Sequence, residues 1–244
     1  MIPIRDENPK PAGYRPKLTY ALIAINVIIF FWEVATTGQF LEFTNQRAAM
    51  LFHQHGTVPA DITEGLIDRN YGVIAPLFSS MFLHAGIMHL GGNMLFLYIF
   101  GDNIEYRFGK GKYLSLYLFW GLVAGFAHIA WDQSSPIPAI GASGAISGVL
   151  GAYLALYPNA KITTFMFFGF FMRMLHISAK WYLPFWFIFQ NVLPLFLSSI
   201  GGSNVAFLAH IGGFLIGLLT GYIYKKTHRS EFTYGTRYGW KGNQ

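Results

Sequence analysis

The sequence predicts an all-α membrane protein, a bundle of six transmembrane helices. Of its 244 residues, 53% are hydrophobic and only 11% are charged, whereas about a quarter of the residues in a soluble domain carry charge. Six apolar stretches each have a length close to the roughly 20 residues that a helix needs to cross a bilayer. Lysine and arginine collect on alternate connections between them, as in multi-spanning proteins. The chain has no cysteine, which excludes disulfides and thiol chemistry.

The six predicted spans are separated by short polar connections and by one longer loop. They cover about 18–35, 78–100, 113–131, 140–157, 181–197 and 205–224. The long loop, 36–76, mixes short apolar patches with charged residues, a composition that suits the headgroup zone. The stretch 163–174 contains Arg173 and precedes His176 and Lys180. We therefore interpret it as a short interfacial piece before the fifth span.

Lysine and arginine fall almost entirely on the side of the membrane that would hold both termini. That side carries Arg5, Lys10, Arg15, Lys17, Arg107, Lys110, Lys112, Lys161, Arg173, Lys180, Lys225, Lys226, Arg229, Arg237 and Lys241. The opposite side keeps only Arg47 and Arg69, so the termini are predicted to be cytoplasmic. The net charge of +6 is thus a topology signal that also attracts anionic lipid, and no nucleic-acid partner is predicted. The predicted organisation is an N-terminal segment 1–17, a membrane domain 18–224 and a tail 225–244.

Polar side chains within the predicted spans are few, and they are candidates for function because burying them in a bilayer is costly. They are His84, His89, Asn93, His128, Ser143, Ser147, Gln190, Asn191 and His210. No Asp or Glu lies within a predicted span, since Glu33 and Asp132 fall at span edges. This argues against a carboxylate proton relay, a Glu-containing zinc protease and an aspartyl protease, all of which need buried carboxylates. We interpret His128 and Ser147 as structural, and His84 as an anchor for the loop that enters the second span.

The second, fourth and sixth predicted spans all run inward from the outer side. At about 1.5 Å per residue, four polar groups on these spans lie within the outer half of the bilayer. They are His89, Asn93, Ser143 and His210. Because water must reach such groups, the sequence predicts a polar cavity that they line and that opens to the outside.

Small residues recur at helical spacing on the fourth and sixth spans. They are Gly144, Gly148, Gly151, Ala155, Gly213, Gly217 and Gly221. Such faces often serve plain packing, and they let helix backbones approach closely. Close approach is also what would bring a serine hydroxyl within about 3 Å of an imidazole, as proton transfer requires.

Four short motifs follow one another along the chain. HAGIMHLGGNM covers 84–94, GDNIEYRFG covers 101–109, GASG covers 141–144 and AHIGG covers 209–213. Each motif is modest alone, but the ordered set resembles the rhomboid intramembrane serine proteases. The resemblance extends from about the second predicted span to the sixth and implies a rhomboid-like bundle.

The resemblance also implies an activity, the hydrolysis of peptide bonds in or near transmembrane segments of membrane proteins. Ser143 would be the nucleophile and His210 the general base of a two-residue catalytic centre. His89, Asn93 and the backbone N–H of Ser143 would form the oxyanion hole. Neither a metal nor an organic cofactor is implied, and the implied partners are transmembrane protein substrates and the lipid bilayer.

Two positions depart from the family pattern. Many relatives carry an aromatic residue one helical turn after the nucleophile, where it supports the catalytic imidazole. Ser147 occupies that position here, so another group must orient His210. The Trp-Arg pair that some relatives carry in the first loop is absent, and Gln46 with Arg47 is the nearest polar match.

Two other functions remain open alongside the protease. A catalytically inactive rhomboid-like protein would bind membrane clients without cutting them. A transporter or metal channel would use the imidazoles of His84, His89, His128 and His210, since imidazole suits zinc, but no carboxylate accompanies them and no repeated halves are seen. Predicted cytoplasmic termini favour a bacterial or archaeal plasma membrane.

Overall fold

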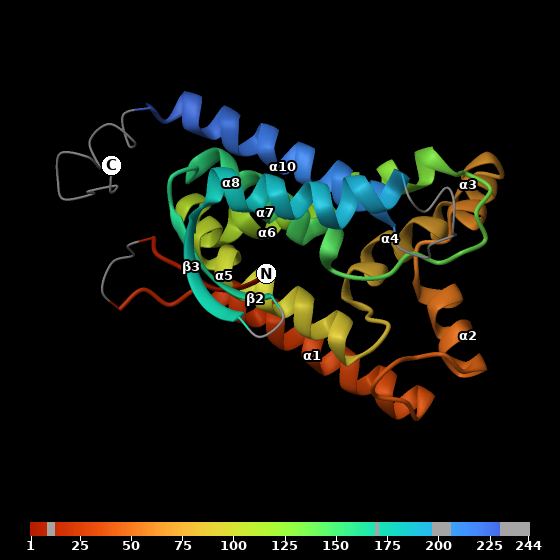
Figure 1. The fold of residues 1–244 in the computed structure, drawn as a ribbon. Coiled ribbons are helices and arrows are strands. Elements are labelled where there is room, and N and C mark those ends of the chain that lie inside the picture. The colour runs from red at the N-terminus through yellow and green to blue at the C-terminus, as the bar shows by residue number, and fades with distance from the viewer. Residues whose placement is uncertain (9–12, 169–170, 197–205, 230–244) are drawn as a thin grey trace.

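Helices make up most of the computed structural model, which describes residues 1–8, 13–168, 171–196 and 206–229 (Figure 1). The long helices are α1 (Lys17–Thr37), α5 (Ile87–Phe108), α6 (Lys110–Trp131), α7 (Ser143–Leu156) and α10 (Phe207–Thr227). Four of them, α1, α6, α7 and α10, agree with the first, third, fourth and sixth predicted spans to within a few residues. Helix α5 overlaps the second predicted span but starts and ends later. The start of the predicted sixth span, Val205, lies outside the described residues.

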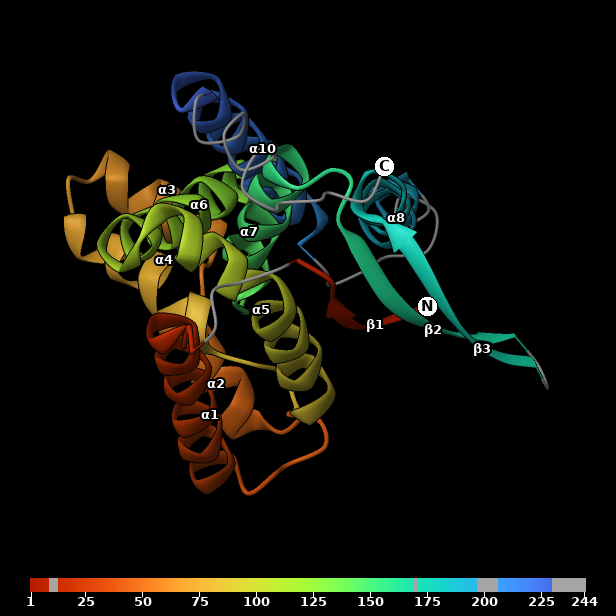
Figure 2. The same ribbon diagram turned by 90° about the vertical axis from the view of Figure 1, so that its left-hand side faces the viewer.

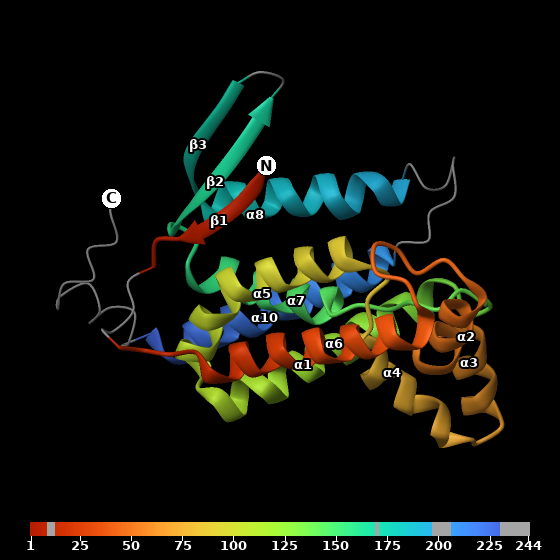
Figure 3. The same ribbon diagram turned by 90° about the horizontal axis from the view of Figure 1, so that it is seen from below.

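The long helices share two common ends. Helices α1 and α6 begin where α5, α7 and α10 finish (Figure 3). We call this the basic end, because Lys17, Arg107, Lys110 and Lys225 lie there. The starts of α5, α7 and α10 lie at the opposite end, which we call the far end.

Helix α7 is the centre of the bundle and packs against α5, α6 and α10 (Figure 2). Eleven of its fourteen residues are buried, so this short helix is apolar on all sides, as expected of a helix enclosed by others. Trp120 and Tyr117 on α6 and Phe100 on α5 are fully buried around it, and Tyr153 on α7 itself is fully buried as well.

The glycines of α7 and α10 bring these two backbones into direct contact, as the spacing predicts. A Cβ atom at Gly213 would lie 2.1 Å from the carbonyl oxygen of Gly144. One at Gly217 would lie 2.0 Å from the carbonyl oxygen of Gly148, and one at Gly151 would lie 2.1 Å from that of Phe214. The contact therefore excludes every side chain at these positions.

Within the described residues, three helices are long and apolar enough to cross a membrane: α1, α6 and α10. A fourth span results if 71–82 and α5, which meet at an angle of 83°, count as one. Helix α7 is apolar but shorter. Length and composition thus support three or four spans, and they do not confirm the predicted bundle of six.

The second predicted span, 78–100, differs from the structure at both ends. The chain bends before α5, which starts at Ile87 and continues to Phe108. Gly86 precedes it with φ +154°, and a Cβ atom there would lie 2.1 Å from the carbonyl oxygen of Leu41. The tight contact with the first loop fixes the bend. At the other end of α5, Gly109, with φ +74°, ends the helix.

Two carboxylates are buried on the long helices: Glu33, which the sequence places at the edge of the first span, and Glu105, in the part of α5 that extends past the predicted second span. Glu33 on α1 is fully buried and accepts a hydrogen bond of 3.0 Å from the backbone N–H of His84. Glu105 on α5 is 1% exposed and accepts from the backbone N–H groups of Leu18 (3.1 Å) and Thr19 (2.7 Å) and from the Thr19 hydroxyl (2.9 Å). Pro16 offers no side-chain cap, so Glu105 caps the start of α1 from another helix.

Replacing Glu105 with alanine should destabilise the protein by about 2–3 kcal/mol, because three donors near the buried start of α1 lose their acceptor. The measurement is the midpoint of thermal unfolding in detergent micelles. Glu64→Ala is the control, since Glu64 is exposed on α3. Equal midpoints for the two variants would contradict the proposed capping role.

The prediction of an all-α protein is wrong in one region. Strands β1 (Ile2–Asp6), β2 (Lys161–Phe168) and β3 (Phe171–Ser178) form an antiparallel sheet in the order β1-β2-β3. The predicted interfacial piece, 163–174, is therefore the greater part of a β-hairpin. Its β-branched and aromatic residues favour strands over helices. Figures 2 and 3 show the hairpin extending away from the helices.

The remaining segments are shorter. The predicted loop 36–76 contains α2 (Gln46–His55), α3 (Pro59–Ile67), η1 (Tyr71–Ile74) and the start of α4 (Ala75–Ser79), which continues into η2 (Ser80–Phe82). The predicted fifth span consists of α8 (Ala179–Phe187), the π-helical turn η3 (Ile188–Val192) and a helical stretch 193–196. Its predicted end, Leu197, lies outside the described residues.

Candidate active site

The starts of α5, α7 and α10 meet at the far end of the bundle around one cavity of about 810 Å³. Its walls include Ser143, His210, His89, Asn93 and Asn191. The first four are the residues predicted from the sequence to share a site, and they come from three different helices. Apolar side chains complete the lining, so the cavity is less polar than predicted; these include Met88, Phe96, Trp186 and Phe207.

Ser143 and His210 contact each other directly. Ser143 is the first residue of α7, and His210 lies in the first turn of α10. The Nε2 atom of His210 lies 2.6 Å from Oγ of Ser143, which is a short hydrogen bond. The glycine contacts between α7 and α10 begin directly after Ser143, so helix packing sets this distance.

Asn191 holds the other side of the His210 ring. Its Oδ1 atom lies 2.6 Å from Nδ1 of His210. An amide oxygen only accepts hydrogen bonds, so Nδ1 carries the proton and Nε2 is free to accept the Ser143 hydroxyl proton. Asn191 is 1% exposed and lies in η3, a π-helical turn of the kind often found at functional sites.

Asn191 therefore answers a question that the sequence left open, namely what orients His210 when Ser147 replaces an aromatic residue. The sequence placed Asn191 among the polar residues of the spans but did not pair it with His210. No motif or local spacing relates the fifth helical segment to the sixth. Only the way that η3 packs against α10 brings the two residues together.

The His89 ring presents one nitrogen to the cavity. The backbone N–H of Ala85 donates to its Nδ1 at 3.2 Å, which leaves the proton on Nε2. A Cβ atom at Gly141 would lie 2.9 Å from Nε2 and 3.4 Å from Oγ of Ser143. Gly141 (φ +124°) thus leaves room for a polar donor close to the serine.

Asn93 and the start of α7 supply further donors. Asn93 lies one turn after His89, is 7% exposed and donates through Nδ2 to the carbonyl oxygen of His89 at 3.1 Å. The first intrahelical bond of α7 runs from Ile146 N–H to the Ala142 carbonyl. The backbone N–H groups of α7 before Ile146 therefore have no acceptor within the helix. A helix start of this kind suits a developing negative charge.

The other polar candidates lie around this centre. His84 is fully buried, and its ring meets that of His89 edge-on at 5.1 Å between centroids. His128, Ser147 and Gln190 line the same cavity. Within the part of the chain that the structure describes, no three His, Asp or Glu side chains gather so as to hold a metal ion.

Fold and site together define a helical membrane protein with a hydroxyl–imidazole pair in the wall of an internal cavity. A family model described as Rhomboid domain matches residues 72–227, more than half of the chain. The chain therefore belongs to the rhomboid family.

Individual relatives agree with this assignment. Rhomboid protease GluP of Bacillus subtilis is 30% identical over 209 residues, covering 83% of this chain and 34% of that protein. Rhomboid protein 1, mitochondrial, of Saccharomyces cerevisiae is 28% identical over 217 residues, covering 86% and 54%. RHOMBOID-like protein 6, mitochondrial, of Arabidopsis thaliana is 32% identical over 177 residues, covering 67% and 48%. The chain thus spans about half or less of the length of these relatives.

Proposed function

We propose that this chain is an intramembrane serine endopeptidase that cuts membrane proteins in or near their transmembrane segments. The observation that carries the proposal is the 2.6 Å contact between Ser143 Oγ and His210 Nε2 in the cavity wall. The name of the Bacillus subtilis relative, a rhomboid protease, supports the same activity.

In the proposed reaction, the Oγ atom of Ser143 attacks the scissile carbonyl carbon while its proton passes to Nε2 of His210. The tetrahedral intermediate collapses when the imidazolium gives that proton to the leaving amine, which leaves an acyl-enzyme. His210 then takes a proton from water while the hydroxide attacks the acyl carbon, and the imidazolium returns that proton to Oγ of Ser143 as the acyl group leaves as a carboxylic acid. The Asn191 amide oxygen accepts from Nδ1–H in both the neutral and the protonated ring, so it fixes the ring orientation throughout.

The oxyanion would form between His89, Asn93 and the start of α7. The Nε2–H group of His89 points to the region beside Gly141 and Ser143, where the carbonyl oxygen of a bound substrate would lie. Removing one such donor typically costs about 10²–10³-fold in rate. A substrate helix must also unwind locally to expose its peptide bond, which favours weak helix formers such as glycine near the cut.

Replacing Asn191 with alanine should lower kcat by about 10–100-fold, with little change in KM. The ring of His210 loses a hydrogen bond worth about 1–3 kcal/mol, and each 1.4 kcal/mol corresponds to about tenfold in rate. The measurement is steady-state cleavage of a transmembrane substrate in liposomes.

Gln190→Ala is the matched control for Asn191→Ala, because Gln190 is the adjacent residue and lines the same cavity, whereas the hydrogen bond to Nδ1 of His210 comes from Asn191. Asn191→Asp keeps an acceptor oxygen and should recover part of the lost rate. A fall in kcat of equal size in Gln190→Ala and Asn191→Ala would show that Asn191 does not act through His210.

The proposal includes the predicted six-span topology, with both termini on the side of the basic end and the catalytic cavity toward the opposite face. The predicted division into 1–17, 18–224 and 225–244 belongs to the same proposal. Relatives named above are mitochondrial or bacterial proteins, so sequence similarity selects no single membrane. A bacterial or archaeal plasma membrane stays a prediction from the distribution of charge.

A fluorophosphonate probe, which reacts with activated serines, tests the proposed function directly. The protein in detergent micelles should become labelled, and Ser143→Ala should not. Folded protein that takes up no label would favour the alternative, a rhomboid-like protein that binds membrane clients without cutting them. Labelling that persists in Ser143→Ala would show that another serine is the nucleophile.

A further inference from the structure

The β2–β3 hairpin changes from polar to apolar along its length. On one face the paired residues run from Lys161 and Ser178 through Thr163 and His176 to Phe165 and Met174, and then to Phe167 and Met172. The last pair is highly exposed: Phe167 is 65% and Met172 is 66% accessible. The half farther from the helices therefore presents large apolar side chains that no described residue covers.

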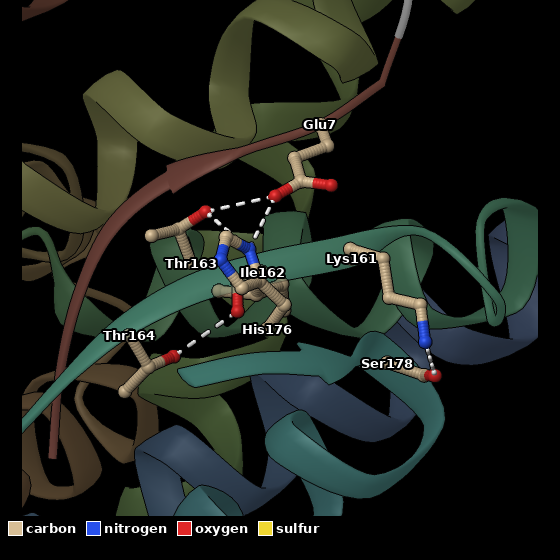
Figure 4. Close-up of polar contacts among 7 residues, drawn as sticks. All are labelled: Glu7, Lys161, Ile162, Thr163, Thr164, His176 and Ser178. Carbon is tan, nitrogen blue, oxygen red and sulfur yellow. Dashed lines mark hydrogen bonds and ion pairs between the residues drawn. The ribbon is translucent and has the colours of Figure 1, made fainter. Parts of the chain in front are cut away.

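The near half of the hairpin is fixed by polar contacts with the N-terminal segment (Figure 4). The carboxylate of Glu7 lies 2.6 Å from Nδ1 of His176 and accepts from the Thr163 hydroxyl at 3.0 Å. Burial alone would raise the pKa of Glu7, but the hydrogen bonds from His176 and Thr163 and the nearby charge lower this pKa overall. Lys161 donates to Ser178 at 3.4 Å. These groups suit water or lipid headgroups.

On the opposite face of the far half, the described side chains are one apolar residue and one charged residue. Met166 is paired there with Arg173, whose exposed side chain is long enough to carry its charge back toward headgroups. An apolar face, together with an arginine whose charge can reach the headgroups, suits the boundary between lipid and water.

The hairpin starts at the basic end, where it is joined to the bundle by backbone hydrogen bonds. Ala179 N–H donates to the Ala160 carbonyl and Lys180 N–H to the Pro158 carbonyl, both at 2.8 Å. Trp181, on the first turn of α8, is 69% exposed, and tryptophan is enriched where a bilayer meets water. Phe185, also on α8, is 47% exposed.

We propose that the far half of this hairpin inserts into the lipid leaflet on the side of the basic end, as a shallow interfacial anchor beside the helical bundle. Strands of this length extend about 3.3 Å per residue, so the four outer residues of each strand reach about 13 Å, enough to pass the headgroups. The outer edge of β3 has no partner strand within the described residues, and unpaired backbone groups are costly in hydrocarbon. That cost keeps the hairpin at the edge of the hydrocarbon, next to the headgroups. The basic residues at this end would attract anionic lipid around it.

Spin labels can measure how deep the hairpin lies in the bilayer. The chain has no cysteine of its own, so each single-cysteine variant carries its label at one known position. Phe167→Cys and Met172→Cys report on the far half, in vesicles of phosphatidylcholine with phosphatidylglycerol. Ile28→Cys, on the exposed surface of α1 (67%), is the lipid reference. Lys180→Cys, exposed at the start of α8, is the reference near water. The measurement is power saturation with oxygen, which concentrates in lipid, and with a water-soluble nickel chelate.

We expect the labels at 167 and 172 to collide with oxygen several-fold more than with the chelate, as the label at 28 does, and the label at 180 to show the reverse. Chelate accessibility at 167 and 172 equal to that at 180 would place the hairpin in water and overturn the proposal. Low accessibility to both reagents would place it against protein, which also overturns the proposal.

Discussion

Replacing Ser143 with alanine should abolish substrate cleavage, with a loss in kcat of at least about 10³-fold. The reaction loses its nucleophile, and only binding and oxyanion stabilisation remain to accelerate attack by water. His210→Ala should cause a loss of the same order, because an unactivated serine hydroxyl is a poor nucleophile. The double variant should be no worse than either single one, since groups that act as a unit are not additive. The measurement is cleavage of a single-pass membrane protein in liposomes.

Ser147→Ala is the matched control for this loss. Ser147 lies one turn after Ser143 on α7 and lines the same cavity, so its removal tests whether any serine in the cavity wall matters equally. We expect Ser147→Ala to retain most of the activity, and we expect the three single variants to unfold at temperatures close to that of the wild type. Full activity in Ser143→Ala, or multiplied losses in the double variant, would contradict the two-residue centre.

Replacing Gly217 with valine should unfold the bundle or weaken it by more than about 4 kcal/mol, a loss seen only when a mutation cannot be accommodated. A Cβ atom at Gly217 would lie 2.0 Å from the carbonyl oxygen and 2.6 Å from the Cα of Gly148. Backbone rather than a flexible side chain is in the way, so α10 would have to move off α7. Because His210 and Ser143 are carried by these two helices, activity should fall with stability.

Gly111→Ala is the control for Gly217→Val. Gly111 lies in α6, and a Cβ atom there would have nothing within 4 Å, so alanine should be neutral or stabilise the helix by up to about 1 kcal/mol. The measurement is unfolding of both variants in detergent, followed by helical circular dichroism. Equal stability of Gly217→Val and wild type would show that the helices are not in the close contact described.

Most helices could be predicted from the sequence because burial in lipid demands long apolar runs. The predicted candidates for one site, Ser143, His210, His89 and Asn93, also lie around one cavity. Motif order and helix direction were enough to bring these four together. Their catalytic roles stay a proposal.

The features that the sequence did not predict all depend on contacts between distant segments. The sheet needs residues 2–6 to pair with 162–165, and hydropathy does not distinguish a hairpin of aromatic residues from an interfacial helix. The bend before α5 depends on Gly86 meeting Leu41. Asn191 meets His210 only through the packing of η3.

The carboxylate that caps α1 bears on what length of chain can fold by itself. The matched family domain begins at residue 72, yet Glu105 within it accepts hydrogen bonds from Leu18 and Thr19, which lie before that boundary. A truncation to 72–227 would leave the buried Glu105 carboxylate without its donors on Leu18 and Thr19. The backbone N–H of His84 would also lose the acceptor that Glu33 provides. We therefore expect the autonomous folding unit of this chain to include its first long helix and to be larger than the segment by which the family is recognised.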